Sequence, residues 1–321
     1  MLHWCYTFFE VIWMSIRYTK LFNLLSERKI SKTTLQKELK ISSATLAKFS
    51  KNEMVSLKVI EEICKFLHCQ ASDILEIVND SDRPLLQRFR EEMKMKLKGG
   101  LYHQTQIKLA YHSNRIEGSM LSEAQTRYIF ETNTLACSQD EATSVDDIIE
   151  TINHFQCFDF MIMVADQALT EDVIKEFHRL IKMNTSDSRK EWFKVGEYKT
   201  RSNMVGDSKT VTPSKVKGEM AKLVINYNSM KTVAFEDLVE FHYLFESIHP
   251  FQDGNGRVGR MILFKECLRW GITPFIIDER HKQFYYRGLK EFEVDRGYLI
   301  DTCFSSQDEY ASLVKYFMEG E

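Results

Sequence analysis

The sequence predicts a mainly α-helical protein: a small helix-turn-helix domain, then a larger helical domain with one short β-hairpin. Only 4 prolines and 13 glycines interrupt the 321 residues, so few positions oppose helix formation. Apolar residues recur at helical spacing along most of the chain, and serines precede several of these stretches where helix caps are expected. The segment Val195–Pro213 breaks this pattern with glycines and β-branched residues, which favours a hairpin.

Charge is unevenly distributed between the two parts. Residues 14–78 contain eleven Lys or Arg and seven Asp or Glu, a net of +4, whereas the whole chain carries −3. A basic N-terminal region followed by an acidic remainder indicates two separate functions. The seven cysteines are odd in number and never spaced as Cys-x-x-Cys, which is typical of reduced thiols in a cytoplasm. No apolar run reaches the roughly 20 residues that cross a membrane, so we expect a cytoplasmic protein without membrane contact.

The first thirteen residues are mostly apolar but contain Glu10. They lack the basic start and the small-residue cleavage site of a signal peptide. Translation therefore begins at Met1 or at Met14, and Met14 is favoured because a regular helical pattern starts just after it.

Residues 14–79 form the first predicted domain, a run of short helices. Apolar residues at helical spacing predict each helix, and serines at the starts of several of these helices are the expected N-caps. The predicted helices lie near Leu21–Leu25, between Ser31 and Leu39, between Ser42 and Phe49, at Leu57–Leu67 and at Ala71–Val78. Only a short link separates the second helix from the third, which is the spacing of a helix-turn-helix.

This domain resembles the Cro/C1-type helix-turn-helix domain of bacterial and phage repressors. The resemblance rests on residues 37–49, on Leu57–Ile60 and on Cys69–Ile74. It implies that the third helix enters the major groove of DNA, and that two copies act together, because one recognition helix reads one half-site. A homodimer is therefore expected. The side chains implied at the DNA are Ser43, Thr45 and Lys48, with Lys51 beside them.

A linker with a helix, residues 80–100, is predicted between the domains. Asp80–Pro84 is polar and contains a proline, as expected of a hinge. Leu85–Lys98 is a charged amphipathic helix that ends at two glycines. Residues 101–321 then form the second, largely helical domain.

Residues 249–260 read His-Pro-Phe-Gln-Asp-Gly-Asn-Gly-Arg-Val-Gly-Arg and carry most of the chemical information in the chain. Phe235–Ile248 has helical apolar spacing, so His249 lies at a helix C-terminus, and Pro250 prevents simple continuation. A second helix is predicted from about Gly256 to Trp270. The loop between them therefore lies at a helix N-terminus, where free amides and the helix dipole attract phosphate. Gly254 and Gly256 allow the backbone to approach an anion closely.

The side chains of this loop supply the remaining groups needed to use a nucleotide triphosphate. His249 is suited to take a hydroxyl proton near neutral pH. Asp253 supplies the oxygen ligand that Mg²⁺ prefers. Arg257 and Arg260 are three residues apart on one helix face and can clamp two phosphate groups.

These twelve residues match the motif His-Pro-Phe-x-Asp/Glu-Gly-Asn-Gly/Lys-Arg with a further Gly-Arg, and the chain is thus similar to the Fic family. Fic proteins mostly transfer AMP from ATP to a hydroxyl side chain of a protein. The resemblance implies a helical Fic domain at 101–321, His249 as the base for a Ser, Thr or Tyr hydroxyl, and Mg²⁺ on Asp253. The implied phosphate-binding residues are Gly254, Asn255, Gly256, Arg257 and Arg260.

Two further segments extend the resemblance. Val195–Pro213 looks like the Fic flap, a hairpin that pairs with an extended target segment. The flap residues implied in target docking are Asn203, Met204 and Val205. Tyr285 and Tyr286 align with a family region near the adenine pocket, although paired tyrosines on a helix also pack in cores.

Ser113–Gly118 matches the Fic inhibitory motif Ser/Thr-x-x-x-Glu-Gly/Asn, on an inhibitory helix near residues 107–118. The resemblance implies that Ser113 and Glu117 belong to a brake in which Glu117 pairs with Arg260 and occupies the place of the γ-phosphate. A carboxylate is apt for this, because it binds guanidinium and repels phosphate.

Several alternatives stay open at this level. The same carboxylate can serve the reverse reaction, removal of AMP from a modified protein. The chain can also be a transcriptional regulator whose body senses a nucleotide. Fic relatives that use UTP or GTP share much of the motif, so ATP is the default donor, and the target protein is not readable from the sequence.

Overall fold

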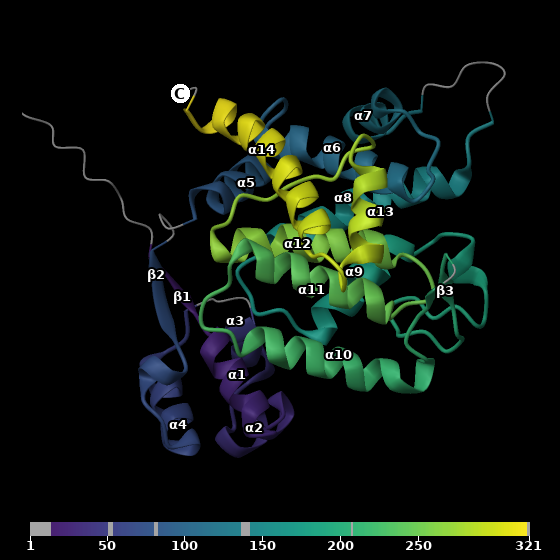
Figure 1. The fold of residues 1–321 in the computed structure, drawn as a ribbon. Coiled ribbons are helices and arrows are strands. Elements are labelled where there is room, and N and C mark those ends of the chain that lie inside the picture. Colours follow the sequence, from purple (N-terminus) through teal and green to yellow (C-terminus); the bar gives the residue numbers. More distant parts are fainter. Residues whose placement is uncertain (1–13, 51–53, 80–82, 136–141, 207, 320–321) are drawn as a thin grey trace, which may run out of the picture. The chain divides into compact units, whose positions relative to one another are not determined.

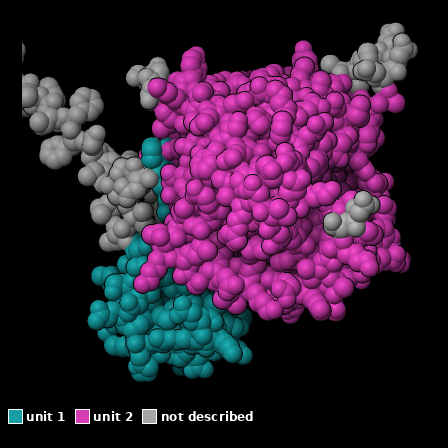
Figure 2. Space-filling model, viewed as in Figure 1, with its two compact units in different colours: residues 1–84 teal, residues 85–321 magenta. Residues whose placement is uncertain are grey.

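The computed structural model describes residues 14–50, 54–79, 83–135, 142–206 and 208–319 (Figure 1). Residues Met1–Trp13, Lys51 and most of the expected hinge at 80–84 lie outside the described residues. The chain divides into two compact units, Met1–Pro84 and Leu85–Glu321 (Figure 2). Helices dominate both units, so the mainly α fold class is confirmed.

The first unit consists of short helices closed by a two-stranded sheet. Serine side chains cap its helices as the sequence indicates: Ser31 accepts from the Thr34 amide at 3.0 Å, and Ser42 from the Thr45 amide at 3.0 Å. Its elements are β1 (Met14–Arg17), α1 (Thr19–Glu27), α2 (Lys32–Leu39), α3 (Ser43–Ser50), α4 (Leu57–Leu67), the 3-10 turn η1 (Ala71–Asp73) and β2 (Glu76–Asn79).

The helix predicted at Ala71–Val78 is wrong. Those residues form the single turn η1 and the strand β2, which pairs antiparallel with β1 from Met14 opposite Asn79 to Arg17 opposite Glu76. The β-branched pair Ile77 and Val78 suits a strand, but its partner lies some sixty residues earlier in the chain. A local apolar pattern does not reveal such a pairing.

The core of the first unit is small and aromatic at its centre. Leu21, Leu35 and Ile63 are fully buried from three different helices. The rings of Tyr18 and Phe49 meet edge to face with centroids 4.7 Å apart. Phe49 thereby ties the end of α3, the expected recognition helix, to the residue that precedes α1.

The second unit is built from ten helices of the described chain and a minimal hairpin. Its elements are α5 (Pro84–Met95), α6 (Leu101–Ile116), α7 (Glu123–Thr132), α8 (Val145–Val164), α9 (Glu171–Lys182), η3 (Asp187–Arg189), β3 (Met204–Val205), β4 (Ser208–Lys209), α10 (Pro213–Asn228), α11 (Phe235–Ile248), α12 (Asn255–Trp270), α13 (Lys282–Glu291) and α14 (Gly297–Glu319). The two strands of the hairpin pair antiparallel, with Val205 opposite Ser208.

Helix α12 is the central element of this unit. It is buried along almost its whole length and packs against α6, α8, α9 and α11. Figure 1 shows α11 and α12 side by side. A helix buried on all sides lets its polar residues face only protein groups, so the arginines near its N-terminus need partners from the surrounding helices.

Helix α5 belongs to the same core, although the sequence assigned residues 80–100 to a linker with a helix. Leu86 and Phe89 are buried in the main cluster, and the ring of Phe89 lies 6.0 Å from that of Phe158. Glu92 is also buried, and its carboxylate accepts from the Tyr102 amide at 2.7 Å at the start of α6.

Within the described part of the chain, no helix is both long and apolar enough to cross a lipid bilayer. The described cysteines Cys64, Cys69, Cys157, Cys267 and Cys303 are free thiols.

We expect Phe264→Ala to reduce the free energy of unfolding by about 3–5 kcal/mol. Phe264 is 1% exposed, and its ring contacts those of Phe89, Phe158 and Tyr310. Urea denaturation followed by circular dichroism measures the change. Phe284→Ala, which removes a 59% exposed ring from α13, should cost less than about 1 kcal/mol. Equal losses for the two variants would contradict the packing described for α12.

Candidate active site

The loop between α11 and α12 is held in a fixed shape by one asparagine. Asn255 is 1% exposed; its Oδ1 accepts from the Phe251 amide at 2.8 Å, and its Nδ2 donates to the Phe251 carbonyl at 2.9 Å. Phe251 is fully buried, so the clamp fixes the loop to the core. His249 ends α11 with φ 50° and Gly254 begins α12 with φ 79°, which turns the chain sharply at both ends of the loop.

His178 of α9 packs against the loop between α11 and α12. Its ring stacks on Phe251 with centroids 4.0 Å apart, Nδ1 accepts from the Gly196 amide at 2.9 Å, and Nε2 lies 3.2 Å from the Asp253 carbonyl. An accepting Nδ1 requires the proton on Nε2, which then donates to Asp253. Burial, with the nearby Lys182 charge, lowers the pKa of His178 to about 3, so the ring stays neutral in this role.

His249 is placed as a neutral imidazole. Burial, reinforced by the Lys199 ammonium, lowers the pKa of His249 to about 4. At neutral pH the ring is therefore unprotonated and able to accept a proton.

The base of the β3–β4 hairpin is bonded to the same loop. The Lys199 amide donates to the Pro250 carbonyl at 2.8 Å, and Lys199 Nζ donates to Asn203 Oδ1 at 2.8 Å and to Thr210 Oγ1 at 2.7 Å. Asn203 Nδ2 in turn donates to the Phe251 carbonyl at 3.1 Å. Asn203 is thus part of the scaffold. Met204 and Val205, the strand residues beyond it, are 57% and 47% exposed and form the accessible edge.

Asp253 is paired with a lysine that the sequence did not single out. Lys182 Nζ donates to Asp253 Oδ2 at 2.6 Å. Although burial would raise it, the charges of Lys182 and Arg257 lower the pKa of Asp253 to about 2, so the carboxylate is ionised at all physiological pH values. One side of this carboxylate remains open, since the side chain is 50% exposed. An ionised, accessible carboxylate fits a hard cation such as Mg²⁺.

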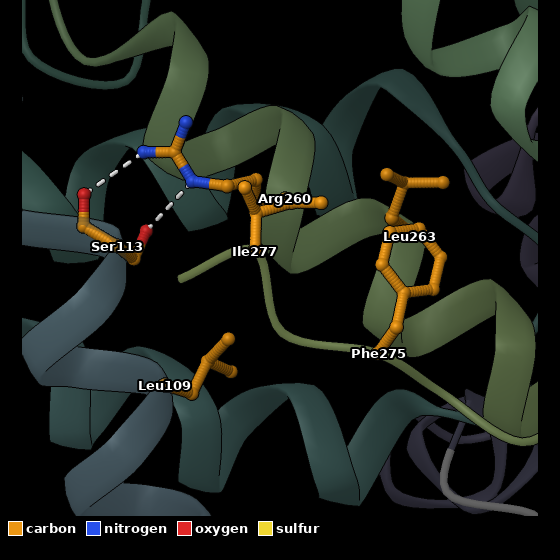
Figure 3. Close-up of a pocket in the computed structure, with 6 residues that line it drawn as sticks. All are labelled: Leu109, Ser113, Arg260, Leu263, Phe275 and Ile277. Atoms are coloured by element: carbon orange, nitrogen blue, oxygen red, sulfur yellow. Dashed lines mark hydrogen bonds between the residues drawn. The ribbon is translucent and has the colours of Figure 1, made fainter. Parts of the chain in front are cut away.

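The two arginines of α12 face different partners. Arg257 forms an ion pair with Glu150 of α8, and its Nη2 lies 3.5 Å from Asp253 Oδ2. Arg260 Nε donates to Ser113 Oγ and Arg260 Nη2 to the Ser113 carbonyl, both at 3.0 Å (Figure 3). Arg260 Nη2 also donates to Glu117 Oε1 at 2.7 Å.

Glu117 occupies a position that suits an anion. It follows the last residue of α6, where the helix dipole disfavours negative charge. Although burial would raise it, the charges of Arg260 and Arg257 and the hydrogen bond from Arg260 together lower the pKa of Glu117. A side-chain carbon at Gly256 would collide with Glu117 Oε1 and with the Arg260 guanidinium. Glycine therefore leaves a cradle at the N-terminus of α12, and a carboxylate fills it where a phosphate oxygen would fit.

The two tyrosines suggested for an adenine pocket lie in different surroundings. Tyr285 is 1% exposed, and its hydroxyl lies 2.7 Å from His242 Nε2 in the core. Tyr286 is 43% exposed, and its hydroxyl donates to the Ile116 carbonyl at 3.2 Å, next to Glu117. Tyr286 is therefore the accessible one of the pair and contacts the end of α6.

A small pocket lies beside Arg260 and Ser113, as Figure 3 shows. Its other lining residues are apolar: Leu109, Leu263, Phe275 and Ile277.

In the first unit, Ser43 and Lys48 are exposed on α3, and Thr45 is half-buried. Ser43 Oγ accepts from Gln36 Nε2 of α2 at 2.9 Å, which joins the two helices of the turn. The Thr45 hydroxyl lies 2.9 Å from Ser42 Oγ in the cap of α3.

Sequence reasoning missed Lys182, its partners Glu150 and Asp187, and the hairpin lysine Lys199. One signal was available. The apolar stripe of α9 runs through Ile174, Phe177 and Ile181, and Lys182 continues it at a position where an apolar residue is expected. A charged residue on a buried stripe requires a partner.

Residues 168–266 match the Fic/DOC family, and residues 20–80 match a Cro/C1-type helix-turn-helix DNA-binding domain. The chain carries a Fic/DOC domain. The helix-turn-helix domain precedes it, and the loop with His249 lies inside the Fic/DOC match.

The curated relatives of this chain are distant. Protein adenylyltransferase fic-1 of Caenorhabditis briggsae is 27% identical over 194 residues, which cover 59% of this chain and 37% of the relative. Protein adenylyltransferase Fic of Nematostella vectensis is 26% identical over 190 residues, covering 56% and 42%. The chain thus matches less than half the length of these curated relatives.

Known structures share the fold. A Fic-domain-containing signalling protein from Bacteroides thetaiotaomicron aligns with a TM-score of 0.62 at 24% identity, covering 75% of this chain and 95% of that one. Fic-1 of Caenorhabditis elegans aligns with a TM-score of 0.56 at 20% identity, covering 93% and 85%.

Acidification below about pH 6.5 should destabilise the protein. Burial lowers the pKa of His154, His178 and His242 to about 3 and that of His249 to about 4, whereas it raises the pKa of Glu246 to about 8. Unfolded histidines titrate near pH 6.5. As the pH falls below this value, the unfolded chain therefore takes up more protons than the folded chain. Stability is present above that pH and declines below it, by about 1.4 kcal/mol per pH unit for each net proton.

Urea unfolding at about pH 7 and about pH 5 measures this effect before most carboxylates titrate. His154→Gln should reduce the pH dependence by about one proton. A protein equally stable at both pH values would contradict the buried neutral state of these histidines.

Proposed function

We propose that this protein is a self-inhibited protein adenylyltransferase that transfers AMP from ATP to a hydroxyl side chain of a protein. The observation that carries the proposal is the contact of Glu117 with Arg260 beside the Gly256 cradle, on the same loop as the neutral His249. A base, a cation-binding carboxylate and an anion site filled by the chain's own carboxylate are the parts such an enzyme requires.

The reaction is an in-line displacement at the α-phosphorus of ATP. His249 accepts the proton of the target hydroxyl, whose oxygen forms the new bond to phosphorus, while the bond to the bridging oxygen breaks and pyrophosphate leaves. The exposed edge of the hairpin at Met204 and Val205 holds the target segment as an added strand.

The nucleotide is held by the first turn of α12. The loop amides from Gly254 to Gly256, with Arg257 and Arg260, bind the phosphate oxygens. Asp253 holds Mg²⁺, which when bound neutralises phosphate charge. Positioning and charge neutralisation thus supply most of the rate enhancement. Tyr286, whose hydroxyl contacts the end of α6, is the candidate residue for contact with the adenine ring.

Glu117 acts as the brake. Its carboxylate takes the Arg260 guanidinium and the space of the γ-phosphate, so ATP binds without the geometry needed for attack. Ser113 holds the other edge of the same guanidinium and fixes it against α6.

We expect wild-type protein to label targets very slowly. Glu117→Gly should raise AMP transfer from labelled ATP by roughly 10²-fold or more, because the Arg260 guanidinium is then free to bind the phosphates. Glu117→Gly combined with His249→Ala should abolish the label. A matched control is Glu279→Gly, which removes an exposed carboxylate that pairs with Arg115 rather than with Arg260. If Glu117→Gly labels no faster than wild type, with cell lysate as target, the brake is wrong.

The same assay separates the alternatives. Label from UTP or GTP in place of ATP identifies another donor. Loss of AMP from a pre-labelled target, catalysed by wild type and not by Glu117→Gly, identifies the reverse reaction, in which Glu117 positions a water.

The first unit binds DNA through α3, as a pair of copies, and thereby regulates transcription. The exposed Lys48 and Ser43 on α3, and the net +4 charge of residues 14–78, support this second activity. Phosphate contacts dominate such affinity and make it salt-dependent.

For DNA selected from a random library by the intact protein, Lys48→Ala should weaken binding several-fold and reduce the slope of log K against log salt by about 1. Lys58→Ala removes an exposed lysine of α4 and should leave affinity nearly unchanged. Equal affinity of wild type and Lys48→Ala at all salt concentrations, measured by fluorescence anisotropy, would contradict the role of α3.

A further inference from the structure

Three carboxylates from separate segments surround the ammonium group of Lys182. Its Nζ lies 2.8 Å from Glu150 Oε1 of α8, 2.9 Å from Asp187 Oδ2 of η3 and 2.6 Å from Asp253 Oδ2 of the catalytic loop. The side chain is 3% exposed. An ammonium has three N–H donors, so each donor is used by one carboxylate. Lys182 thus joins three segments of the chain, α8, η3 and the loop before α12, through its ion pairs.

The three carboxylates do not depend equally on Lys182. Glu150 also pairs with Arg257, and Asp187 also pairs with Lys190, whose Nζ lies 2.6 Å from Asp187 Oδ1. The second cation at Asp253 is more distant: Arg257 Nη2 lies 3.5 Å from its Oδ2. Asp253 is thus the carboxylate whose orientation and charge environment rest chiefly on Lys182.

The stem of Lys182 also lies under the turn that begins α12. A Cβ at Gly254 would come within 3.3 Å of Lys182 Cγ. The ammonium is therefore fixed at the buried side of Asp253, while the exposed half of the carboxylate faces outward. A metal ion approaching from solvent meets a carboxylate already bound to a positive charge.

We propose that Lys182 is a positioning residue that acts as a resident cation: it orients Asp253 and weakens binding of a free divalent metal ion there, so that metal binds tightly only together with the nucleotide. The inference rests on the proposed function in that the metal is the Mg²⁺ of a nucleotide complex. In the resting site Glu117 then stands where a phosphate would lie, and Lys182 supplies positive charge beside the metal ligand.

The physical reason is the repulsion between two like charges a few ångströms apart. At such distances a unit charge changes the binding of a second ion by well over a factor of ten in a partly buried site. The negative phosphates of a nucleotide offset this repulsion, which makes metal binding depend on nucleotide. Loss of the ammonium leaves Asp253 with only the more distant Arg257 as a cationic neighbour, so the carboxylate attracts the metal more strongly.

The test is binding of Mn²⁺ alone to the full chain without nucleotide, measured by the loss of the electron paramagnetic resonance signal of free Mn²⁺. Lys182→Met keeps the length of the side chain and removes its charge. Lys182→Arg keeps the charge. Lys190→Met is the matched control, because it removes a positive charge from Asp187 without touching Asp253. Lys182→Met with Asp253→Asn tests whether any gain arises at Asp253.

Lys182→Met should bind Mn²⁺ roughly tenfold or more tightly than wild type. Lys182→Arg and Lys190→Met should bind like wild type, and the double variant should lose the gain. A merely structural lysine gives the opposite change, because a disordered loop binds metal less tightly. Mn²⁺ affinity of folded Lys182→Met that equals or falls below wild type overturns the inference.

If Lys182→Met alone does not fold, as circular dichroism would reveal, Lys182→Met combined with Asp187→Asn keeps the local charge balance and carries the same expectation. None of these readouts uses AMP transfer. A Glu117→Gly variant that labels no faster than wild type would therefore reject the proposed brake while leaving the Mn²⁺ result to decide the role of Lys182.

Discussion

The burial of two guanidinium groups at the start of α12 is the constraint on which the rest of the site depends. Arg257 and Arg260 are 3% and 5% exposed, and a buried charge is tolerated only with a partner of opposite charge. Glu150 from α8 and Glu117 after α6 supply those partners. The packing of α6 and α8 against α12 is thus tied to the charge balance of the loop.

This charge balance means that the ionised groups of the loop compensate one another within the protein. Each cation that would contact phosphate already contacts a carboxylate, and the carboxylate suited to a metal already contacts an ammonium. Under the proposed function, nucleotide binding is an exchange of ion pairs in a partly buried site, where every replaced contact is costly. The proposed brake, Glu117, lies at the end of a helix and is 30% exposed, whereas Glu150, the partner of Arg257, is 15% exposed.

Several elements could be predicted from the sequence because their signals are local. The apolar spacing of Phe235–Ile248 and the glycines after it predicted α11, the loop and α12 to within one residue. Serine caps marked the starts of α2 and α3 in the same way. The strand β2 was missed because its partner β1 lies at the other end of the unit, and a strand is stabilised by its neighbour rather than by its own pattern.

For the site, the sequence by itself determined the loop, its glycine turn and its candidate base at His249, because these residues lie close together in the chain. The pairing of Glu117 with Arg260 was implied only by the resemblance of Ser113–Gly118 to the Fic inhibitory motif, since the two residues lie 143 positions apart. Only the tertiary structure decided that Arg257 is shared between Glu150 and Asp253, that Tyr285 is buried against His242, and that Lys182 reaches Asp253. The reason is physical: an ion pair needs a few ångströms in space and places no limit on separation along the chain.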